Sequence, residues 1–191
     1  MNERTMGSVS KTDQQYDAIK QTCLGVFTSK MQDYGTAWRV LRPASLTDQI
    51  YIKAQRIRSL QRKGTQKILE GIAPEFVGIV NYAVMGLIQL ERGAADQADL
   101  PAEEAAEKWG EYFEKARSLM HDKNHDYSEA WREMRVSSLA DIILMKLLRV
   151  KQIEDNEGKT FVSEGVDANL YDIINYAVFA LIKLELEGKN D

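Results

Sequence analysis

Two segments of the chain carry the same basic residues at the same spacing. In each, an arginine follows a tryptophan, a second arginine comes three residues later, and a lysine and an arginine stand three residues apart further on. In a helix the last two would share one face, and arginine and lysine commonly bind phosphate oxygens. We therefore predict a phosphate- or anion-binding set. Its members are Arg39, Arg42, Lys53, Arg56, Arg132, Arg135, Lys146 and Arg149.

The alternative is that these cations form salt bridges inside the protein. Acidic residues recur at the same spacing and could pair with them, which would join the two segments. These acids are Asp33, Asp48, Glu70 and Glu91 and their counterparts. The pattern alone does not separate a binding site from internal salt bridges, so both interpretations stay open here.

The second segment also offers oxygen ligands for a hard cation. Asp126, Glu164 and Asp172 supply carboxylates, which are ligands that Mg²⁺ prefers. Asp172 stands where the first segment has Gly78, within an otherwise apolar stretch. Because an unpaired carboxylate is costly there, we predict that any Mg²⁺ site belongs to the second segment and that the first has lost it.

Aromatic and amide side chains next to the cations could position a base. Tryptophan and tyrosine rings can stack on any base, although a tryptophan beside a helix end can also close a core. An asparagine inside an apolar helix can hold a ligand or fix the register of facing helices. The candidates for positioning a base or ligand are Trp38, Trp131, Tyr127, Asn81 and Asn175.

Two histidines suggest a third kind of site. His121 and His125 are four residues apart, a spacing that suits metal ligands on a helix. The stretch HDKNHD resembles the metal motif of HD phosphohydrolases, whose chemistry would require both histidines, Asp126 and a distant aspartate to meet. The sequence contains no phosphate-binding glycine loop, G-x-S-x-G or CxxC motif.

These residues belong to a duplicated unit. Residues 30–58 align with residues 123–151 at a constant offset of 93, and Glu70–Glu91 aligns with Glu164–Glu185 at an offset of 94. We predict a disordered tail at 1–11, a first helical repeat at 12–93, a linker at 94–101 and a second repeat at 102–191. Because each unit is too small to bury much core alone, the two should pack as one domain.

Each unit should contain three helices. Apolar residues at three- and four-residue spacings predict helices, with S-x-x-D pairs at Ser45 and Ser138 as N-terminal caps, Pro74 at a first helical position and Asp167 as a cap. The expected spans are 13–31, 45–63, 74–93, 102–120, 138–153 and 167–188. The fold class is therefore all-α, with the two units forming one pseudo-two-fold bundle.

The repeated motif resembles a known family. DY(G/S)xAWRxxR, S-L-x-D-x-I-x-x-K-x-x-R, an E-G pair and N-Y-A are similar to the nucleotide modification associated domain 1 family, in two tandem copies. That resemblance implies a role connected with modified nucleotides or bases. A looser likeness is to all-α nucleoside triphosphate pyrophosphatases of the MazG and dimeric dUTPase type, which bind Mg²⁺ through E-x-x-E and E-x-x-D motifs. Here the first spacing occurs in EAAE (104–107) and EYFE (111–114).

Composition limits the classes of protein that fit. The chain has 191 residues, is 44% hydrophobic and carries a net charge of −4, which argues against a general nucleic-acid binder with a basic stripe. Cys23 is the single cysteine and fits a buried position in a cytoplasmic protein. The apolar run at 76–90 is shorter than the ~20 residues that span a bilayer, so we expect no membrane partner.

The predicted function is the binding, with or without hydrolysis, of a nucleotide or another phosphorylated ligand. Mg²⁺ is the one cofactor that the residues suggest. The competing hypothesis is a non-enzymatic helical interaction module whose repeated charges are internal salt bridges. Either a monomer with internal pseudo-symmetry or a homodimer is compatible with the sequence.

Overall fold

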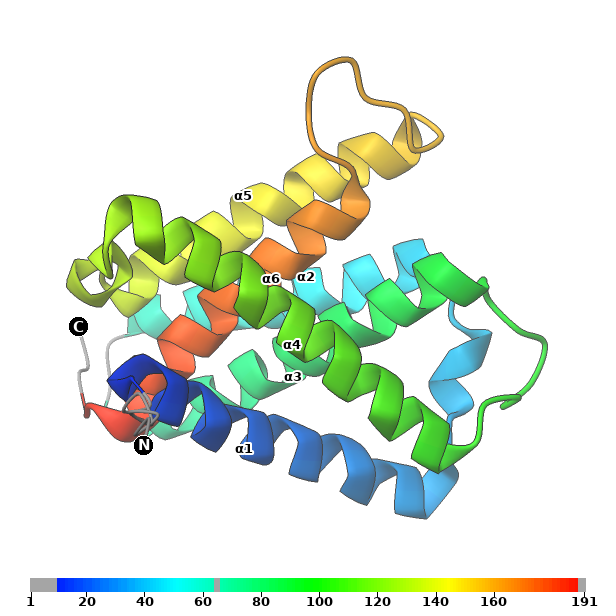
Figure 1. The fold of residues 1–191 in the computed structure, drawn as a ribbon, viewed down its shortest axis with the longest axis horizontal. Coiled ribbons are helices and arrows are strands. Elements are labelled where there is room, and N and C mark those ends of the chain that lie inside the picture. Colours follow the sequence, from blue (N-terminus) through cyan, green and yellow to red (C-terminus); the bar gives the residue numbers. More distant parts are fainter. Residues whose placement is uncertain (1–9, 64–65, 189–191) are drawn as a thin grey trace, which may run out of the picture.

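The computed structural model describes residues 10–63 and 66–188, and for residues 66–70 and 124–127 it describes the backbone alone. These residues form helices without any strand, which confirms the predicted all-α fold. Figure 1 shows them in chain order as α1 (Lys11–Tyr34), η1 (Ala37–Val40), α2 (Pro43–Lys63), α3 (Gln66–Arg92), α4 (Ala102–Tyr127), η2 (Ala130–Glu133), α5 (Val136–Asp155), α6 (Val166–Leu181) and a π-helical turn, η3 (Ile182–Leu186).

The order of elements repeats along the chain. A long helix, a short 3₁₀ helix and two further helices make up the first half, and the same series follows in the second. The predicted tail falls mostly on residues 1–9, which lie outside the described residues, and α1 already begins at Lys11. Residues 93–101 connect the two halves without helix, close to the predicted linker.

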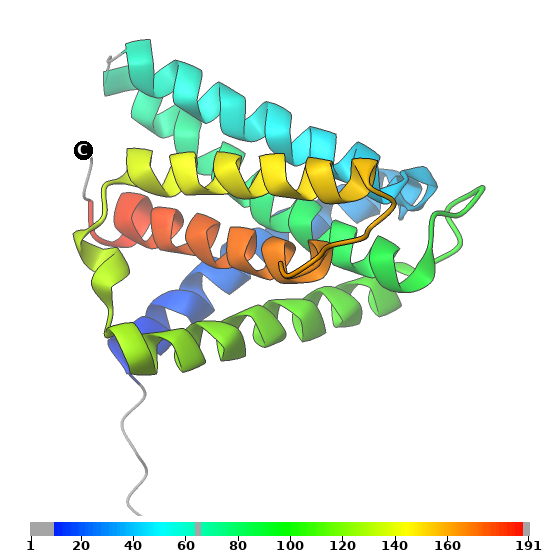
Figure 2. The same ribbon diagram turned by 90° about the horizontal axis from the view of Figure 1, so that it is seen from above.

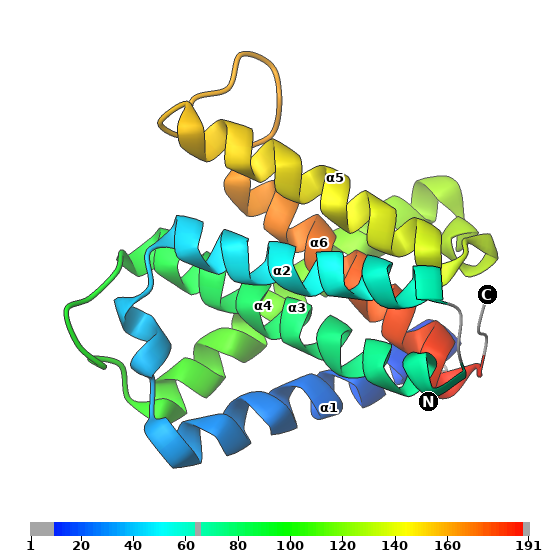
Figure 3. The ribbon, with the colours of Figure 1, turned by 180° about the vertical axis from the view of Figure 1, so that it is seen from behind.

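The most apolar helices lie in the middle of the bundle. In Figure 2, α3 and α6 run between the α2/α5 pair and the α1/α4 pair, and α3 packs on α6. Figure 3 shows α2 and α5 side by side on the opposite face from α1 and α4. The burial of α3 and α6, the last long helix of each half, follows from their composition. A helix that is apolar nearly all round must be covered on every side. Ile79, Val80, Ile173 and Ile174 are fully buried.

Two asparagines link the halves by reciprocal hydrogen bonds. The Asn81 side chain donates to the carbonyl of Cys23 (3.0 Å) and accepts from the Trp109 indole (2.9 Å). Its counterpart, Asn175, donates to the carbonyl of Ala116 (2.8 Å) and accepts from the Tyr16 hydroxyl (3.0 Å). Each asparagine side chain therefore has one hydrogen-bond partner in its own half and one in the other half. This supports the interpretation that the asparagines fix the register of facing helices.

Ion pairs between α2 and α5 are reciprocal in the same way. Asp48 of α2 pairs with Lys151 of α5, and Asp141 of α5 pairs with Arg58 of α2 at 3.6 Å. In the alignment Asp48 corresponds to Asp141, and Arg58 to Lys151. Contacts of this kind are expected when the same surface of two copies meets around a two-fold axis. The two-fold arrangement itself stays a prediction.

Several helix boundaries differ from those predicted. α3 begins at Gln66, so Pro74 lies inside the helix instead of starting it. Proline has no backbone N–H, so the helix lacks one hydrogen-bond donor at this position. Because α3 continues through Pro74, Ile72 stays in the core, where it is 1% exposed. α4 likewise continues beyond 120 to Tyr127. Packing against the rest of the bundle therefore outweighs the local preference of proline for a helix start.

The predicted N-terminal caps were also wrong. α2 begins at Pro43 and α5 at Val136, so Ser45 and Ser138 lie within the first turn of helices that have already started. Asp167 follows the true cap of α6, Gly165. The C-terminal cap of α1 is Gly35, and this residue has φ 59°. Its counterpart, Ser128, ends α4 with φ 55°.

One part of α3 satisfies the length and composition expected of a membrane span. This is Gly71–Arg92, which is longer than the apolar run recognised in the sequence. However, 67% of the most apolar 18-residue stretch of this helix is buried inside the protein. The core helix of a soluble protein can have the same length and composition.

Candidate functional site

Each half contains a cavity at the same place. It lies between the end of the first long helix, the short 3₁₀ helix and the last helix, and its volume is about 130 Å³ in the first half and about 390 Å³ in the second. Except for Ala130 and Met134, every residue that lines the second cavity has its counterpart in the lining of the first. The second cavity is lined by Met120, Lys123, Ser128, Ala130, Trp131, Met134, Asp172, Asn175, Tyr176 and Phe179.

A charged cluster forms one wall of the second cavity. Asp172 is 8% exposed, and its carboxylate contacts the Lys146 ammonium at 2.6 Å and the Lys123 ammonium on its other oxygen. Lys146 is buried, whereas the Lys123 side chain is 55% exposed. Burial and the nearby Asp172 raise the pKa of Tyr176, so its hydroxyl remains a hydrogen-bond donor at neutral pH. The wall therefore presents Asp172 and Lys123, and Lys146, which does not line the cavity, contacts Asp172.

The rest of the lining of this cavity is mostly apolar. The Trp131 ring stacks on Phe179, with ring centroids 4.3 Å apart and planes 5° apart. The Arg132 guanidinium lies over the same ring, 4.3 Å from its centroid. Because both groups already cover Trp131, it forms a fixed wall and does not offer an open face on which a base could stack.

The first cavity has the same frame with different chemistry. Gly78 replaces the aspartate, and the Lys53 side chain lies directly against it: a β-carbon there would stand 2.6 Å from Lys53 Cε. Lys53 pairs with Glu75 at 3.1 Å, and Glu75 also pairs with Arg56 at 3.1 Å. Trp38 lines this cavity, and the exposed Tyr34 lies at its edge.

The first arginine of each repeat is held by protein groups. Arg39 is 3% exposed and pairs with Asp99 at 2.7 Å, while one of its amino groups donates to the carbonyl of Gly93 at 2.8 Å. Arg132 pairs with Glu187 at 2.7 Å and with Glu129. These contacts match the alternative of internal salt bridges for these two residues.

The remaining cations of the set lie in different surroundings. Lys53 lines the first cavity, and Lys146 contacts the acid of the second. Arg149 borders a separate hollow of about 520 Å³ beneath the α5–α6 loop, together with Glu164 and Asn169. Arg42 and Arg135 are exposed. The eight predicted cations are therefore not gathered in one cleft.

The three carboxylates predicted to bind Mg²⁺ lie in different surroundings, as far as the structure describes them. Both oxygens of Asp172 are in contact with lysines, and Glu164 is exposed at the separate hollow. The side chains of Asp126 and Tyr127 lie outside what the structure describes. In the described part of the chain, no three histidine, cysteine or acidic residues come together as metal ligands would. The Mg²⁺ site therefore stays a prediction.

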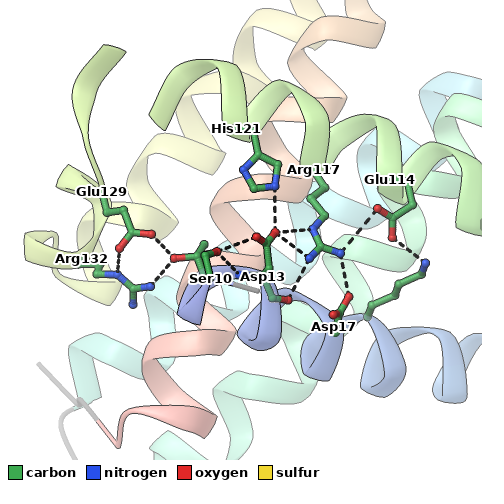
Figure 4. Close-up of polar contacts among 10 residues, drawn as sticks. Ser10, Asp13, Asp17, Glu114, Arg117, His121, Glu129 and Arg132 are labelled. Carbon is green, nitrogen blue, oxygen red and sulfur yellow. Dashed lines mark hydrogen bonds and ion pairs between the residues drawn. The ribbon is translucent and has the colours of Figure 1, made fainter. Parts of the chain in front are cut away.

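His121 belongs to a polar seam between α1 and α4. Figure 4 shows its ring next to Asp13, with His121 Nε2 3.0 Å from Asp13 Oδ1. Arg117 contacts the same carboxylate at 2.8 Å and Asp17 at 2.7 Å. His125, which the HD-type hypothesis also needs, has no described side chain. The seam joins the two halves at the bundle surface. Within it, His121 contacts Asp13 and not a cluster of metal ligands.

Two cationic site residues could have been predicted from the sequence but were not. Lys30 and Lys123 line the first and second cavities and occupy equivalent positions at the start of the aligned segments. Recurrence at the offset of 93 was the signal that could have identified them. Phe179 and Met134 were missed for another reason, since apolar side chains next to a cavity look like ordinary core residues in a sequence.

Comparison with known families supports the duplication. A model of the family described as nucleotide modification associated domain 1 matches residues 30–90 and again residues 123–184. Together these matches span more than half of the chain, which therefore belongs to this family in two copies. No curated protein and no solved structure shows a significant match.

Proposed function

We propose that this nucleotide modification associated domain protein binds a nucleotide, or a closely related phosphorylated ligand, in the cavity of its second half. One observation carries the proposal: a cavity of about 390 Å³ with apolar walls and a compact charged cluster on one side. That volume falls in the range of ~300–1,000 Å³ typical of small-molecule sites, which combine apolar walls with a few polar groups.

The two parts of the lining suit the two parts of a nucleotide. Met120, Met134 and Phe179 provide apolar surface for a base or sugar. Asp172 can accept hydrogen bonds from base or sugar N–H and O–H groups, since an ionised carboxylate is an acceptor only. The family description, with its reference to nucleotide modification, supports the same ligand class.

Lys123 is the group best placed to receive a phosphate. It reaches the cavity wall, yet its side chain is 55% exposed, so it can exchange its contact with Asp172 for a phosphate oxygen at little cost. Asp172 would keep its second partner, Lys146, which is buried. The three groups together carry one net positive charge, and a charge-assisted hydrogen bond to an anion is worth about 1.5–3 kcal/mol.

A thermal-shift screen against nucleoside mono-, di- and triphosphates, each with and without Mg²⁺, tests the proposal. A ligand at about 100 times its dissociation constant adds ~2.7 kcal/mol to the free energy of unfolding. We expect a rise in melting temperature with at least one nucleotide and a smaller rise for Lys123→Ala. The absence of any shift across the panel would contradict nucleotide binding. Hydrolysis stays a prediction, to be tested by phosphate release from the nucleotide that binds.

The interaction-module hypothesis keeps one observation in its favour. Arg39, Arg132 and Lys146 all contact carboxylates inside the protein, as that hypothesis predicts for the repeated cations. If no nucleotide changes the melting temperature, these contacts make a binding module for another protein the preferred function. Affinity capture with the full chain would then be the next experiment.

A further inference from the structure

The first cavity differs from the second by the loss of its acid. Position 172 is an aspartate in the second half, and the corresponding position in the first is Gly78. The residues that line the first cavity include Lys30 and Lys53 and contain no aspartate or glutamate. Two cavities with one frame therefore have different electrostatics.

Lys53 occupies the space that the missing side chain would fill. A β-carbon at Gly78 would stand 2.6 Å from Lys53 Cε and 2.9 Å from its ammonium nitrogen. Such distances are too short for any side chain at this position without displacing the lysine. The glycine thus allows an ammonium group to lie at the wall where the second half has a carboxylate.

The cations of this cavity are only partly neutralised. Glu75 contacts both Lys53 and Arg56, each at 3.1 Å, so one negative charge serves two positive ones. Lys30 lines the cavity and forms no ion pair within the described residues. Lys30, Lys53 and Arg56 against Glu75 leave an excess of positive charge beside the cavity, which favours an anion.

Two aromatic side chains line the cavity beside these cations. Trp38 is 8% exposed, and its indole N–H, like that of its counterpart Trp131, is buried without a hydrogen-bond partner in the described part of the chain. Tyr82, which also lines the cavity, lies beneath the Lys53 ammonium, 5.8 Å from ring centroid to nitrogen. A volume of about 130 Å³ is below the usual range for a complete small-molecule ligand but suits a single tetrahedral anion.

We infer that the cavity of the first half is a phosphate-binding site, chemically distinct from the cavity of the second half. Its cations are Lys30 and Lys53, and its ligand class is inorganic phosphate or the terminal phosphate of a phosphomonoester. The inference stands independently of nucleotide binding in the second half, because it rests on different residues.

Isothermal titration of the full chain with inorganic phosphate, at constant ionic strength, tests this inference. We expect saturable binding, and we expect it to weaken by about tenfold or more in Lys30→Ala, which removes a charge-assisted hydrogen bond. Gly78→Asp should weaken it similarly, because it brings a carboxylate to the wall as in the second half. Arg62→Ala removes the same charge from an exposed position on α2 and should change the affinity by less than about twofold.

Circular dichroism and melting temperature establish that each variant is folded before it is titrated. Because Lys30 is exposed at the end of α1, Lys30→Ala keeps the test decisive even if Gly78→Asp fails to fold. Absence of saturable phosphate binding to the wild-type chain would overturn the inference. So would equal weakening by Lys30→Ala and Arg62→Ala, which would indicate general charge attraction. Neither result bears on nucleotide binding in the second half, which is tested at other residues.

Discussion

At the scale of single residues, the duplication allows equivalent positions in the two halves to be compared. Asp172 and Gly78 stand at equivalent positions, and the lysines around them adapt: Lys146 pairs with Asp172, whereas Lys53 turns to Glu75. The sequence marked Asp172 as the informative asymmetry. It could not show that lysines would satisfy the carboxylate, because those lysines come from α4 and α5 and meet it only through tertiary packing.

The buried pair of Asp172 and Lys146 makes a prediction about stability. Asp172→Asn removes the charge that compensates Lys146, and stranding a buried charge costs about 3–5 kcal/mol. We expect a loss of this order in urea unfolding, and recovery of most of it in the double variant Asp172→Asn/Lys146→Met. Glu164→Gln, at an exposed carboxylate, is the control and should change little. A single variant within about 0.5 kcal/mol of wild type would show that the pair does not contribute.

A second prediction concerns the ends of the first long helices. Ser128 adopts φ 55° and ψ −160°, nearly the conformation of its counterpart Gly35, at φ 59° and ψ −144°. A residue with a β-carbon is strained there, at a cost of about 1–3 kcal/mol. Ser128→Gly should therefore raise the free energy of unfolding by about 1 kcal/mol, and Gly35→Ser should lower it. Thermal melts of both variants measure the difference, and a destabilised Ser128→Gly would refute the proposed strain.

At the scale of elements, helices could be predicted but their ends could not. Apolar periodicity identified all six long helices, because burial on one face imposes that pattern. Pro74 and the two S-x-x-D pairs misled the boundaries, since local capping preferences are worth only about 1 kcal/mol and packing of residues such as Ile72 outweighs them. The aligned repeat was the more reliable guide, because it reflects the tertiary contacts of both halves at once.

The α1–α4 seam predicts how stability depends on pH. The pKa of Asp13 is lowered, first by the hydrogen bond from Ser10 and then by Arg117 and His121. Beyond the end of α4, next to η2, the hydrogen bond from Arg132 likewise lowers the pKa of Glu129. A carboxyl whose pKa is lower in the folded state contributes stability above its unfolded pKa, and loses it as pH falls through the folded value. The free energy of unfolding should therefore fall as pH drops below about 4, because these two carboxyls become protonated and lose their stabilising contribution.

Asp13→Asn tests this link. The variant removes one of the carboxyls that must bind a proton on acid unfolding, so its stability should fall less steeply between pH 5 and pH 2 than that of the wild type. Urea titrations across this range give the slope. Asp96→Asn, at an exposed position in the connection between the halves, should leave the slope as it is. An unchanged slope in Asp13→Asn would mean that the seam does not control acid stability.

At the scale of the whole molecule, the two halves form one structure. α3 packs on α6, and the Asn81–Trp109 and Asn175–Tyr16 hydrogen bonds cross from one half to the other. Because neither half completes its core alone, unfolding should be a single cooperative transition. Tryptophan fluorescence and circular dichroism should give coincident urea curves. Two separated transitions would show that the halves are independent domains.

One comparison by isothermal titration shows whether a nucleotide occupies the cavity of the second half. Ala130 is an exposed residue on the wall of that cavity, and its counterpart, Ala37, does not line the first cavity. Ala130→Trp and Ala37→Trp are thus the same change, made once at the cavity and once away from it. We predict at least about tenfold weaker nucleotide binding, ~1.4 kcal/mol, for Ala130→Trp and wild-type affinity for Ala37→Trp. Equal affinity in both variants would mean that the nucleotide does not occupy this cavity.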